Sequence, residues 1–295
     1  METEPLISIG IPTYNRPAGI RKTLDSIISQ SYKNLEIIVS DNASTDPAVR
    51  IILEEYSNQD KRIKVFTQKE NIGMVRNFNY VAEVANGEYF MWKADDDVIS
   101  DKNYISKLYE FISINDLDFG FTECVFNRPK QESKKMFFEV YKNCQTNFDY
   151  LNSFISKSFA CLEFYGLYNR KRFLQNAGSF QLDVTVNCPD IIYLPKLFLN
   201  SKVGFCPDIE YEYIHEASVD SYKRTLTIFQ DRRKLLKELF INIQESNNIS
   251  NEEKKIVLSN LLNYFEAIII DNYNKPFSHV LKEKVKSFLG WSSAS

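Results

Sequence analysis

The first hundred residues alternate between short apolar runs and longer stretches in which apolar residues recur three and four positions apart. The apolar runs predict β-strands at residues 6–11, 35–40, 63–66 and 88–92. The stretches between them predict helices at residues 17–28, 47–57 and 73–85. Strands that alternate with helices of this length are typical of parallel sheets with right-handed crossovers. We therefore expect an α/β fold with a mostly parallel sheet flanked by helices.

The remainder of the chain has a less regular pattern. It predicts helices at residues 101–114, 148–158 and 191–199, and a short helix that begins at residue 168. Further strands are predicted at residues 118–126, 134–141, 203–206 and 209–214. From residue 221 onward the pattern is helical, with helices near 222–246, 250–272 and 276–289. We expect an α/β domain over residues 1–220, with halves that meet near residue 100, and a helical C-terminal region over residues 221–295.

Polar residues follow each of the first four predicted strands at the point where the strand ends. They form the segments Pro12–Arg16, Asp41–Asp46, Asn71–Arg76 and Asp95–Asp97. Because the carboxyl ends of parallel strands meet at one edge of a sheet, we expect these four loops to gather there. That edge is also where ligands bind in open α/β sheets.

Three adjacent carboxylates, Asp95, Asp96 and Asp97, stand at the end of the fourth predicted strand. Like charges side by side repel, and they are expensive to leave unpaired unless they face water or a cation. Mg²⁺ and Mn²⁺ take oxygen ligands and commonly bridge a carboxylate to a substrate phosphate. The alternative is an acidic turn that caps a helix beginning near Asp101, and for an isolated Asp triplet that is the commoner case. The position after a buried strand and the motifs upstream favour the cation.

The composition excludes several classes of function. The chain has 295 residues, 44% of them hydrophobic and 25% charged, as in ordinary globular proteins. A net charge of −3 and a pI near 5.7 give no field that would favour nucleic acid. No window approaches about 18 apolar residues, and the acidic start Met1–Glu4 lacks the basic head of a signal peptide. Five widely spaced cysteines indicate reduced thiols, so we expect a cytoplasmic protein. Neither GxGxxG nor GxxxxGK[ST] occurs, which argues against a dinucleotide enzyme and a P-loop NTPase.

Four motifs together resemble the family 2 glycosyltransferases, which have the GT-A fold. They lie in the family's order and spacing across roughly residues 5–100, and they are Ile11-Pro12-Thr13-Tyr14-Asn15-Arg16, Val39 to Asp46, Asn71-Ile72-Gly73 with Arg76-Asn77, and Asp95-Asp96-Asp97. The resemblance is looser from 101 to 215 and ends near 220. It implies a nucleotide-binding half (1–100), an acceptor-binding half (101–220) and metal-assisted, inverting transfer of a sugar. The donor would be a nucleotide-sugar, most simply a UDP-sugar, and the acceptor a glycan or lipid-linked glycan, as in bacterial surface polysaccharide assembly.

The resemblance also implies roles for individual residues. Thr13 and Tyr14 would lie against the base and ribose of the donor, and Asp41 would accept a hydrogen bond from the base. The full set expected to bind the nucleotide-sugar is Pro12, Thr13, Tyr14, Arg16, Asp41, Asn42, Asn71, Gly73, Arg76, Asp95 and Asp96. The divalent cation, Mn²⁺ or Mg²⁺, would be held by Asp97, Asp95 and His215. The triplet aligns with the family's D-x-D in two ways, because a commoner form has Asp in place of Ala94, and Asp97 is a metal ligand in either register.

The catalytic base of the family is a carboxylate at the head of a helix, often in a Glu-Asp pair. Asp190 matches it, with Pro189 in place of the usual Glu. Sugar transfer needs such a base, because the attacking hydroxyl must lose its proton. Taken alone, an Asp after Pro is more often a helix N-cap, and the two roles can coexist. The motif context favours base recognition for Asp41, helix capping for Asp46 and close backbone approach for Gly73.

Several interpretations stay open. Acceptor stacking is one use of the aromatic residues Phe159, Phe164, Tyr165 and Tyr168, although core packing is the commoner one. Basic helix faces beyond residue 221 suit an anionic membrane surface, whereas solvated faces or a homodimer contact are the commoner explanations. A nucleotidyltransferase would usually carry a Gly-rich basic first loop, which this chain lacks. A non-catalytic glycan- or nucleotide-binding module would not need Asp97 and Asp190.

Overall fold

Eight strands form one mixed sheet in the computed structural model, which describes residues 4–127, 134–135, 138–156, 161–176, 180–183, 189–214 and 237–272. The strands are β1 (Ile7–Thr13), β2 (Leu35–Asp41), β3 (Ile63–Thr67), β4 (Tyr89–Trp92), β5 (Phe119–Asn127), β6 (Lys134–Lys135), β7 (Leu167–Asn169) and β8 (Val203–Ile214). Their order is β3-β2-β1-β4-β7-β5-β6, and β8 pairs with β5. Strands β1 to β4 are mutually parallel, as are β5 and β8, whereas β6 and β7 run antiparallel to their neighbours. The mostly parallel sheet is confirmed.

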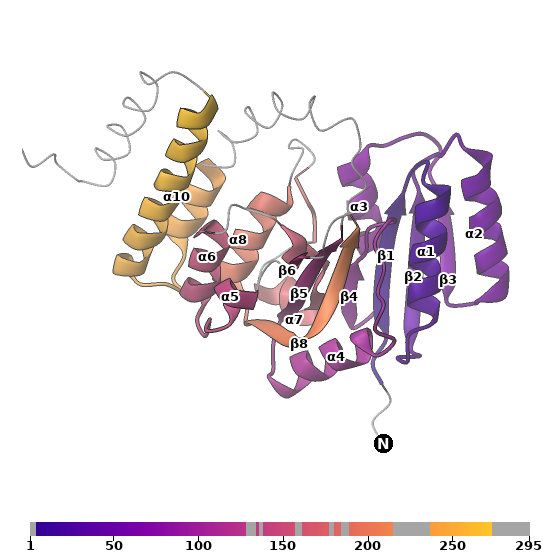
Figure 1. Cartoon of the computed structure of the whole chain (residues 1–295), viewed down its shortest axis with the longest axis horizontal. Coiled ribbons are helices and arrows are strands. Elements are labelled where there is room, and N and C mark those ends of the chain that lie inside the picture. Colours follow the sequence, from indigo (N-terminus) through magenta and orange to yellow (C-terminus); the bar gives the residue numbers. More distant parts are fainter. Residues whose placement is uncertain are drawn as a thin grey trace, which may run out of the picture.

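Helices cover the sheet at both of its ends (Figure 1). They are α1 (Pro17–Ile28), α2 (Pro47–Gln59), α3 (Met74–Glu83), α4 (Tyr104–Ile114), α5 (Phe138–Tyr141), α6 (Asn147–Ser156), the 3₁₀ helix η1 (Leu162–Tyr165), α7 (Arg170–Asn176), α8 (Asp190–Asn200), a helix over 237–245, and α10 (Asn251–Asn272). Figure 1 shows α1, α2 and α3 beside β1 to β3, and α5, α6, α8 and α10 together at the far end. Helix α10 contacts α6, which contacts α8.

One part of the hydrophobic core surrounds β1, all of whose residues are buried. Helix α3 lies so close to it that a Cβ added to Gly10 would come within 2.8 Å of the Val81 side chain. A second part of the core surrounds Trp92 at the end of β4. The Trp92 ring stacks on Phe164 with centroids 4.4 Å apart and meets Tyr193 edge to face at 5.8 Å. Because these rings come from η1 and α8, the aromatic cluster fixes both elements relative to the end of β4.

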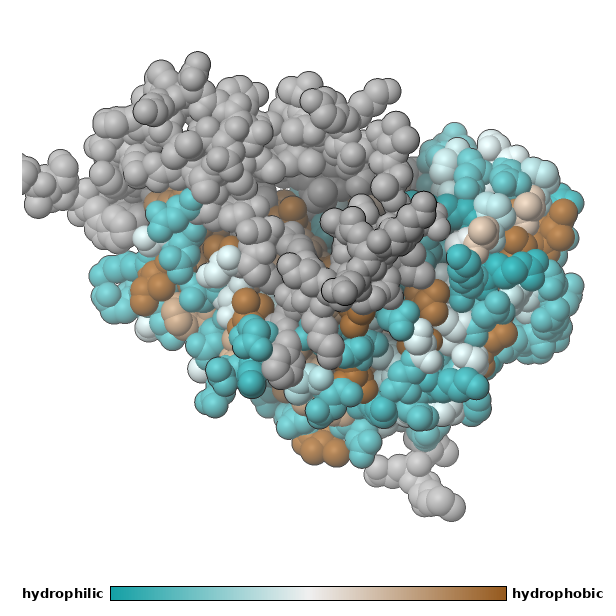
Figure 2. Space-filling model, viewed as in Figure 1, coloured by the Kyte–Doolittle hydropathy of each residue, from teal (hydrophilic) through white to brown (hydrophobic). Residues whose placement is uncertain are grey.

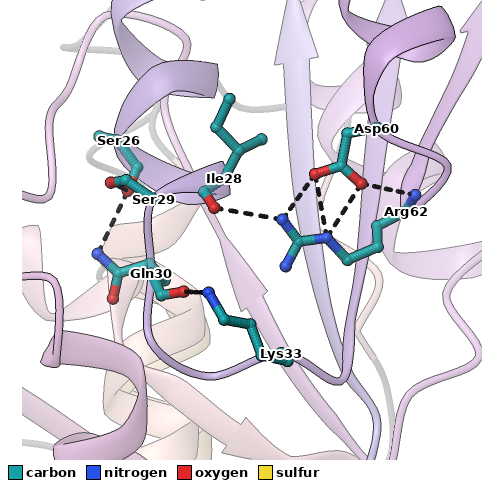
Figure 3. Close-up of polar contacts among 7 residues, drawn as sticks. All are labelled: Ser26, Ile28, Ser29, Gln30, Lys33, Asp60 and Arg62. Carbon is teal, nitrogen blue, oxygen red and sulfur yellow. Dashed lines mark hydrogen bonds and ion pairs between the residues drawn. The ribbon is translucent and has the colours of Figure 1, made fainter.

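The edge of the sheet at which β2 and β3 begin is held by polar contacts to the C-terminal end of α1 (Figure 3). Arg62 donates from Nη2 to the Ile28 carbonyl at 3.3 Å and forms an ion pair with Asp60 at 2.6 Å. Lys33 donates to the Gln30 carbonyl at 2.7 Å. The last carbonyls of a helix lack intrahelical donors and carry partial negative charge, so Arg62 stabilises this end of α1, while Lys33 holds the turn that follows the helix.

Three predicted elements differ from the structure. One strand was predicted over residues 134–141, but the described parts of this range are the two-residue β6 and the helix α5, whose Tyr141 is buried and donates to Glu163. The helix predicted from residue 168 begins at Arg170, because Tyr168 lies in β7 between β4 and β5. The two strands predicted at 203–206 and 209–214 are one strand, β8. Its register against β5 shifts after Cys206, where Pro207 lacks the N–H for a ladder bond.

Several expectations fall on other parts of the chain. His215, Phe159, the boundary near residue 220 and the helix predicted at 276–289 lie outside the described residues, as do most residues of the expected basic helix faces. Within the residues that are described, no helix has the length and apolar character needed to cross a membrane. Figure 2 shows that the surface over the β1 to β3 end is mainly hydrophilic. The domain boundary, the membrane contact and the homodimer stay predictions.

Candidate active site

The four predicted loops meet at the carboxyl edge of β1 to β4. Thr13 pairs with Asp41 in the β1–β2 register, and its hydroxyl donates to Oδ2 of Asp95 at 2.7 Å. One residue further along, Asn42 accepts from the backbone N–H of Ile72 at 2.8 Å and donates to Oδ1 of Asn71 at 3.0 Å. The first loop therefore contacts the second and fourth, and the second contacts the third. The expectation that these loops gather at one edge is confirmed.

Asn15 joins the first loop to the second through most of its polar atoms. Its Oδ1 accepts from the backbone N–H groups of Thr45 and Asp46 at 2.8 and 3.0 Å, and its own N–H donates to the Ser44 hydroxyl at 2.9 Å. Asn15 and Ala43 have φ values of 54° and 59°, in the left-handed region that few non-glycine residues adopt. Strained backbone of this kind is concentrated at functional sites.

Asp95 and Asp96 face the guanidinium of Arg16. Asp96, whose side chain is 25% exposed, forms an ion pair with Nη1 of Arg16, and Oδ1 of Asp95 lies 3.8 Å from Nε. Burial raises the pKa of Asp95, while the hydrogen bond from Thr13 and the charge of Arg16 oppose the rise. Helix α1 packs tightly beneath this loop, since a Cβ on Gly19 would lie 2.6 Å from the Asp95 carbonyl oxygen. Two carboxylates thus lie together at the sheet edge with one cationic partner.

Asp97 is placed differently from its two neighbours. Its side chain is 0% exposed and accepts a hydrogen bond from the Tyr211 hydroxyl at 2.7 Å. That hydroxyl in turn accepts from Nζ of Lys93 at 2.9 Å, and the ammonium lies 4.2 Å from the Tyr211 ring centroid. Burial lowers the pKa of Lys93 to about 8, against the opposing effect of the Asp97 charge. The backbone carbonyl of Asp97 accepts from the Thr23 hydroxyl at 2.9 Å.

The donor set suits a cation that is shared with a ligand. No group of three or more His, Cys, Asp or Glu side chains within the described ranges is arranged to hold a metal ion by itself. Mg²⁺-type sites, however, commonly use one or two carboxylates and complete the shell with water and substrate phosphates. Asp95 and Asp96 fit that pattern, whereas the burial of Asp97 speaks against direct ligation. The roles predicted for Asp97 and His215 as ligands stay predictions.

The remaining residues expected to bind the donor line the same edge. Asp41 is buried and accepts from the backbone N–H of Ser44 at 3.0 Å, which closes a turn rather than capping a helix. Tyr14 is 40% exposed, and Arg76 is exposed beside the third loop, where it donates to the Ile72 carbonyl at 3.4 Å. Asp46 caps α2 by accepting from Ala48 N–H at 2.9 Å, as predicted.

The structure gives a different reason for the glycine at position 73 than the one predicted. No atom lies within 4 Å of a Cβ added there, so close approach of the protein's own backbone does not explain the glycine. The φ of 86° at Gly73 explains the glycine, because that backbone conformation is strained for residues with a side chain. Pro12 is buried at the end of β1, and Asn71, which precedes the turn, accepts from the Gly73 N–H at 2.9 Å. Contact between these residues and a nucleotide remains a prediction.

Asp190 opens α8. It is the first helical residue, and the N-cap position belongs to Pro189, so the N-cap interpretation of Asp190 is wrong. Burial raises the pKa of its carboxyl to about 6, while backbone N–H groups and the Cys161 thiol oppose the rise and Glu163 adds to it. The residue as a whole is only partly buried. A carboxylate with a pKa near 6 is ionised at neutral pH and more basic than an ordinary Asp, which suits a general base.

The segment Cys161–Tyr165 connects Asp190 to the Asp triplet. Cys161 hydrogen-bonds the Asp190 carboxylate, Phe164 stacks on Trp92 two residues before Ala94, and Tyr165 stacks on Tyr211. Of the aromatic acceptor candidates, Phe164 and Tyr168 are core residues, and Tyr165 is partly exposed. The sequence analysis did not identify Lys93 or Tyr211. The one available signal was a lysine that directly follows four apolar strand residues.

Comparison with known proteins identifies the family of the chain. The profile of glycosyl transferase family 2 matches residues 8–171 of the chain. Glycosyltransferase GlyA of Streptococcus pneumoniae is 32% identical over 251 residues, which cover 77% of this chain and 35% of GlyA. An uncharacterized glycosyltransferase of Haemophilus influenzae is 39% identical over 116 residues, which cover 39% of this chain and 35% of that protein. The chain thus spans about a third of the length of these curated relatives.

Solved structures share the fold. S. aureus TarS 1–349 in complex with UDP-GlcNAc superposes with a TM-score of 0.72 at 19% identity, covering 90% of this chain and 73% of TarS. The mannosyltransferase PcManGT from Pyrobaculum calidifontis, in complex with GDP-Man and Mn²⁺, gives 0.57 at 14% identity, covering 98% and 84%. The predicted GT-A class is confirmed by the match to TarS. Because the family profile covers more than half of the residues, the chain belongs to glycosyl transferase family 2.

Proposed function

We propose that this glycosyltransferase is metal-dependent and inverting, that its donor is a nucleotide-sugar, most simply a UDP-sugar, and that its acceptor is a glycan or lipid-linked glycan. The observation that carries the proposal is the meeting of Thr13, Asp41, Asp95 and Asp96 at one sheet edge. Asp190 is joined to that edge through Cys161–Tyr165. These contacts support a single region that would both bind a charged donor and carry the carboxylate for proton transfer.

The nucleotide lies across the first three loops in this proposal. Asp41 recognises the base, and Thr13 and Tyr14 contact the base and ribose. Arg16, which forms an ion pair with Asp96, would exchange this partner for the diphosphate of a bound donor. A guanidinium suits this exchange, because its donors match phosphate as well as carboxylate oxygens.

Asp95 and Asp96 would be the residues that hold the divalent cation. When bound, the cation neutralises the charge that develops on the departing diphosphate. Two carboxylates facing Arg16 form a net negative site, which a divalent cation satisfies better than a single guanidinium does.

Asp190 is the general base. It takes the proton of the acceptor hydroxyl as that oxygen forms a bond to the anomeric carbon, while the bond from that carbon to the diphosphate oxygen breaks. The products are the glycosylated acceptor, the nucleoside diphosphate and protonated Asp190. A single displacement of this kind inverts the anomeric centre.

The relatives support the donor class and the cellular setting. TarS has been solved with UDP and with UDP-GlcNAc, and PcManGT with GDP-Man and Mn²⁺. TuaG of Bacillus subtilis, 35% identical over 119 residues, is a putative teichuronic acid biosynthesis glycosyltransferase. We therefore place the chain in bacterial surface polysaccharide assembly and rank uridine donors ahead of guanosine donors.

A thermal-shift screen tests the donor site. UDP-sugars, GDP-sugars and dTDP-sugars are added to the protein in Mn²⁺ or in EDTA. A ligand at a hundredfold excess over its Kd stabilises the fold by about 2.7 kcal/mol, which is a measurable rise in melting temperature. We expect this rise with a UDP-sugar in Mn²⁺, and we expect Asp41→Ala to abolish it. Asp46→Asn, the matched control, should keep the rise, because Asp46 caps α2. The proposal fails if no nucleotide raises the melting temperature.

A further inference from the structure

A buried hydrogen-bonded chain, Lys93–Tyr211–Asp97, lies directly behind the Asp95–Asp96 loop. Tyr211, which lies in β8, is 114 residues away from Asp97 in the sequence. We propose that Tyr211 is a positioning residue, which ties the Asp95–Asp96 loop to the Cys161–Tyr165 segment beside the catalytic base. This inference rests on the proposed function and assigns a role to a residue that touches neither substrate.

The Tyr211 hydroxyl acts as both donor and acceptor. It donates to Oδ2 of Asp97 at 2.7 Å and accepts from Nζ of Lys93 at 2.9 Å. Both charged side chains are 0% exposed. Buried charges are tolerated only with close partners, so this arrangement has few alternatives of similar energy. The hydroxyl therefore holds the two charges, and the backbone that carries them, in one geometry.

This geometry turns the neighbouring carboxylates toward Arg16 at the edge of the sheet. The Asp97 side chain is anchored inward by Tyr211, and its carbonyl is anchored by the Thr23 hydroxyl of α1 at 2.9 Å. The side chains just before it then meet Arg16 at the sheet edge, with Asp95 12% exposed and Asp96 25% exposed. Lys93 balances the charge of Asp97, so the negative charge that faces a ligand comes from Asp95 and Asp96.

The ring of Tyr211 makes the second connection. It stacks on Tyr165 with centroids 5.7 Å apart and an interplanar angle of 3°. Tyr165 ends η1, which begins directly after Cys161, the hydrogen-bond partner of the Asp190 carboxylate. One side chain thus contacts the loop proposed to hold the donor and the segment that supports the base.

Two substitutions test the hydrogen bonds of the Tyr211 hydroxyl and the stacking of its ring separately. Tyr211→Phe keeps the ring and removes the hydroxyl, and Tyr211→Leu removes both. The matched control is Tyr104→Phe, which keeps the ring that contacts Tyr211 (centroids 6.2 Å apart) and removes a buried hydroxyl that pairs with Thr122 at 3.2 Å instead of Asp97 or Lys93. Calorimetric titration of UDP into the full chain in Mn²⁺ gives donor affinity, donor turnover gives kcat and KM, and thermal melts give stability.

We expect Tyr211→Phe to weaken Mn²⁺-dependent UDP binding at least tenfold and to raise KM for the donor, with kcat recovered at saturating Mn²⁺ and donor. The UDP affinity of Tyr104→Phe should stay within twofold of the wild type, even if its melting temperature falls as much as that of Tyr211→Phe. Tyr211→Leu should lose kcat at saturation as well, because the stack on Tyr165 is gone. A merely structural hydroxyl would lower stability in both Phe variants without separating their KM values.

Equal UDP affinity in Tyr211→Phe and Tyr104→Phe overturns the inference while leaving the proposed function intact. Absence of Mn²⁺-dependent UDP binding in the wild type overturns the proposed function itself. Should Tyr211→Phe fail to fold, Thr23→Val tests the same loop, because this near-isosteric change removes the anchor on the Asp97 carbonyl. It should weaken Mn²⁺-dependent UDP binding three- to tenfold, and wild-type affinity in that variant contradicts the need for an anchored loop.

Discussion

Replacing Asp190 by Asn should separate activity from stability. Folding raises the pKa of this carboxyl from 3.8 to about 6, chiefly through burial. Each pKa unit corresponds to about 1.4 kcal/mol, so the ionised carboxylate costs the folded state at most about 3 kcal/mol at pH 8. Partial solvent contact reduces this figure, and we expect Asp190→Asn to gain about 1–2 kcal/mol, or roughly 2–6 °C in melting temperature.

The sign of the effect depends on pH. A folded-state pKa above the unfolded one means that the cost is fully present above about pH 6 and disappears below about pH 4. The stability gained by Asp190→Asn should therefore shrink as the pH falls from 6 to 4. Over the same range the wild-type kcat should fall, because the base becomes protonated.

Turnover should respond in the opposite direction to stability. A positioned general base contributes about 10²- to 10⁴-fold to a rate, and an amide cannot take the proton. We expect Asp190→Asn to lose at least a hundredfold in kcat, with UDP affinity in Mn²⁺ unchanged. The assays are thermal melts at pH 4 to 8, UDP titration, and nucleoside diphosphate release with acceptor present.

Asp149→Asn is the matched control, since Asp149 also lies in the first turn of a helix, α6. Burial acts to raise the pKa of Asp149, but the N–H groups of Gln145 and Thr146 and the Thr146 hydroxyl outweigh it and lower the pKa. Asp149→Asn should therefore lose stability at neutral pH and keep kcat. An Asp190→Asn variant that retains full turnover refutes the assignment of the base, and one that is destabilised at pH 8 refutes the electrostatic reasoning.

Two further substitutions test other parts of the account. Asp96→Asn should abolish the gain in UDP affinity that Mn²⁺ gives, while binding in EDTA stays at the wild-type level; a retained Mn²⁺ effect in calorimetry would exclude Asp96 as a ligand. Glu36→Gln, at the opposite edge of the sheet, should lower stability by roughly 2–3 kcal/mol at pH 7 and leave kcat unchanged. Burial alone would raise the pKa of Glu36, but hydrogen bonds from Lys64, Ser8 and Asn86 lower it to about 2. The stabilising contribution of Glu36 is thus present above about pH 4.5 and lost as the pH falls toward 2. Acid-induced unfolding, followed by circular dichroism, measures this contribution. Identical unfolding curves for the wild type and Glu36→Gln would contradict the prediction.

The location of the site was predictable because it follows from topology. Four strands alternate with helices, parallel strands end at the same edge, and polar residues follow each strand. Thr13, Asp41 and Asp95 were therefore expected together without knowledge of any contact. The capping role of Asp46 was predictable for a similar reason, since it depends only on the residues that follow it.

The orientation of the Asp triplet was not predictable, because its cause lies far away in the sequence. The resemblance to the family singles out Asp97 as a metal ligand, but nothing in the local sequence indicates that Asp97 is buried while the Asp96 side chain is partly exposed. The distinction comes from Tyr211 on β8 and from Lys93, whose burial no local pattern indicates. The strand β7 was missed for a related reason, since three residues are too few to show an alternating pattern.

The raised pKa of Asp190 likewise depends on distant segments. The sequence places this residue at the head of a helix, where an Asp usually has a stabilising role. Its pKa is set by burial and by Cys161 and Glu163 in a segment that precedes it by almost thirty residues. The aromatic cluster around Trp92 brings the two segments together.

The most direct test of the central claim is calorimetric titration of UDP into the wild-type chain, once in Mn²⁺ and once in EDTA. Four loops that hold a nucleoside diphosphate through a cation on Asp95 and Asp96 predict one site per chain and at least tenfold tighter binding in Mn²⁺. Absence of binding, or equal affinity with and without the metal, would contradict the account.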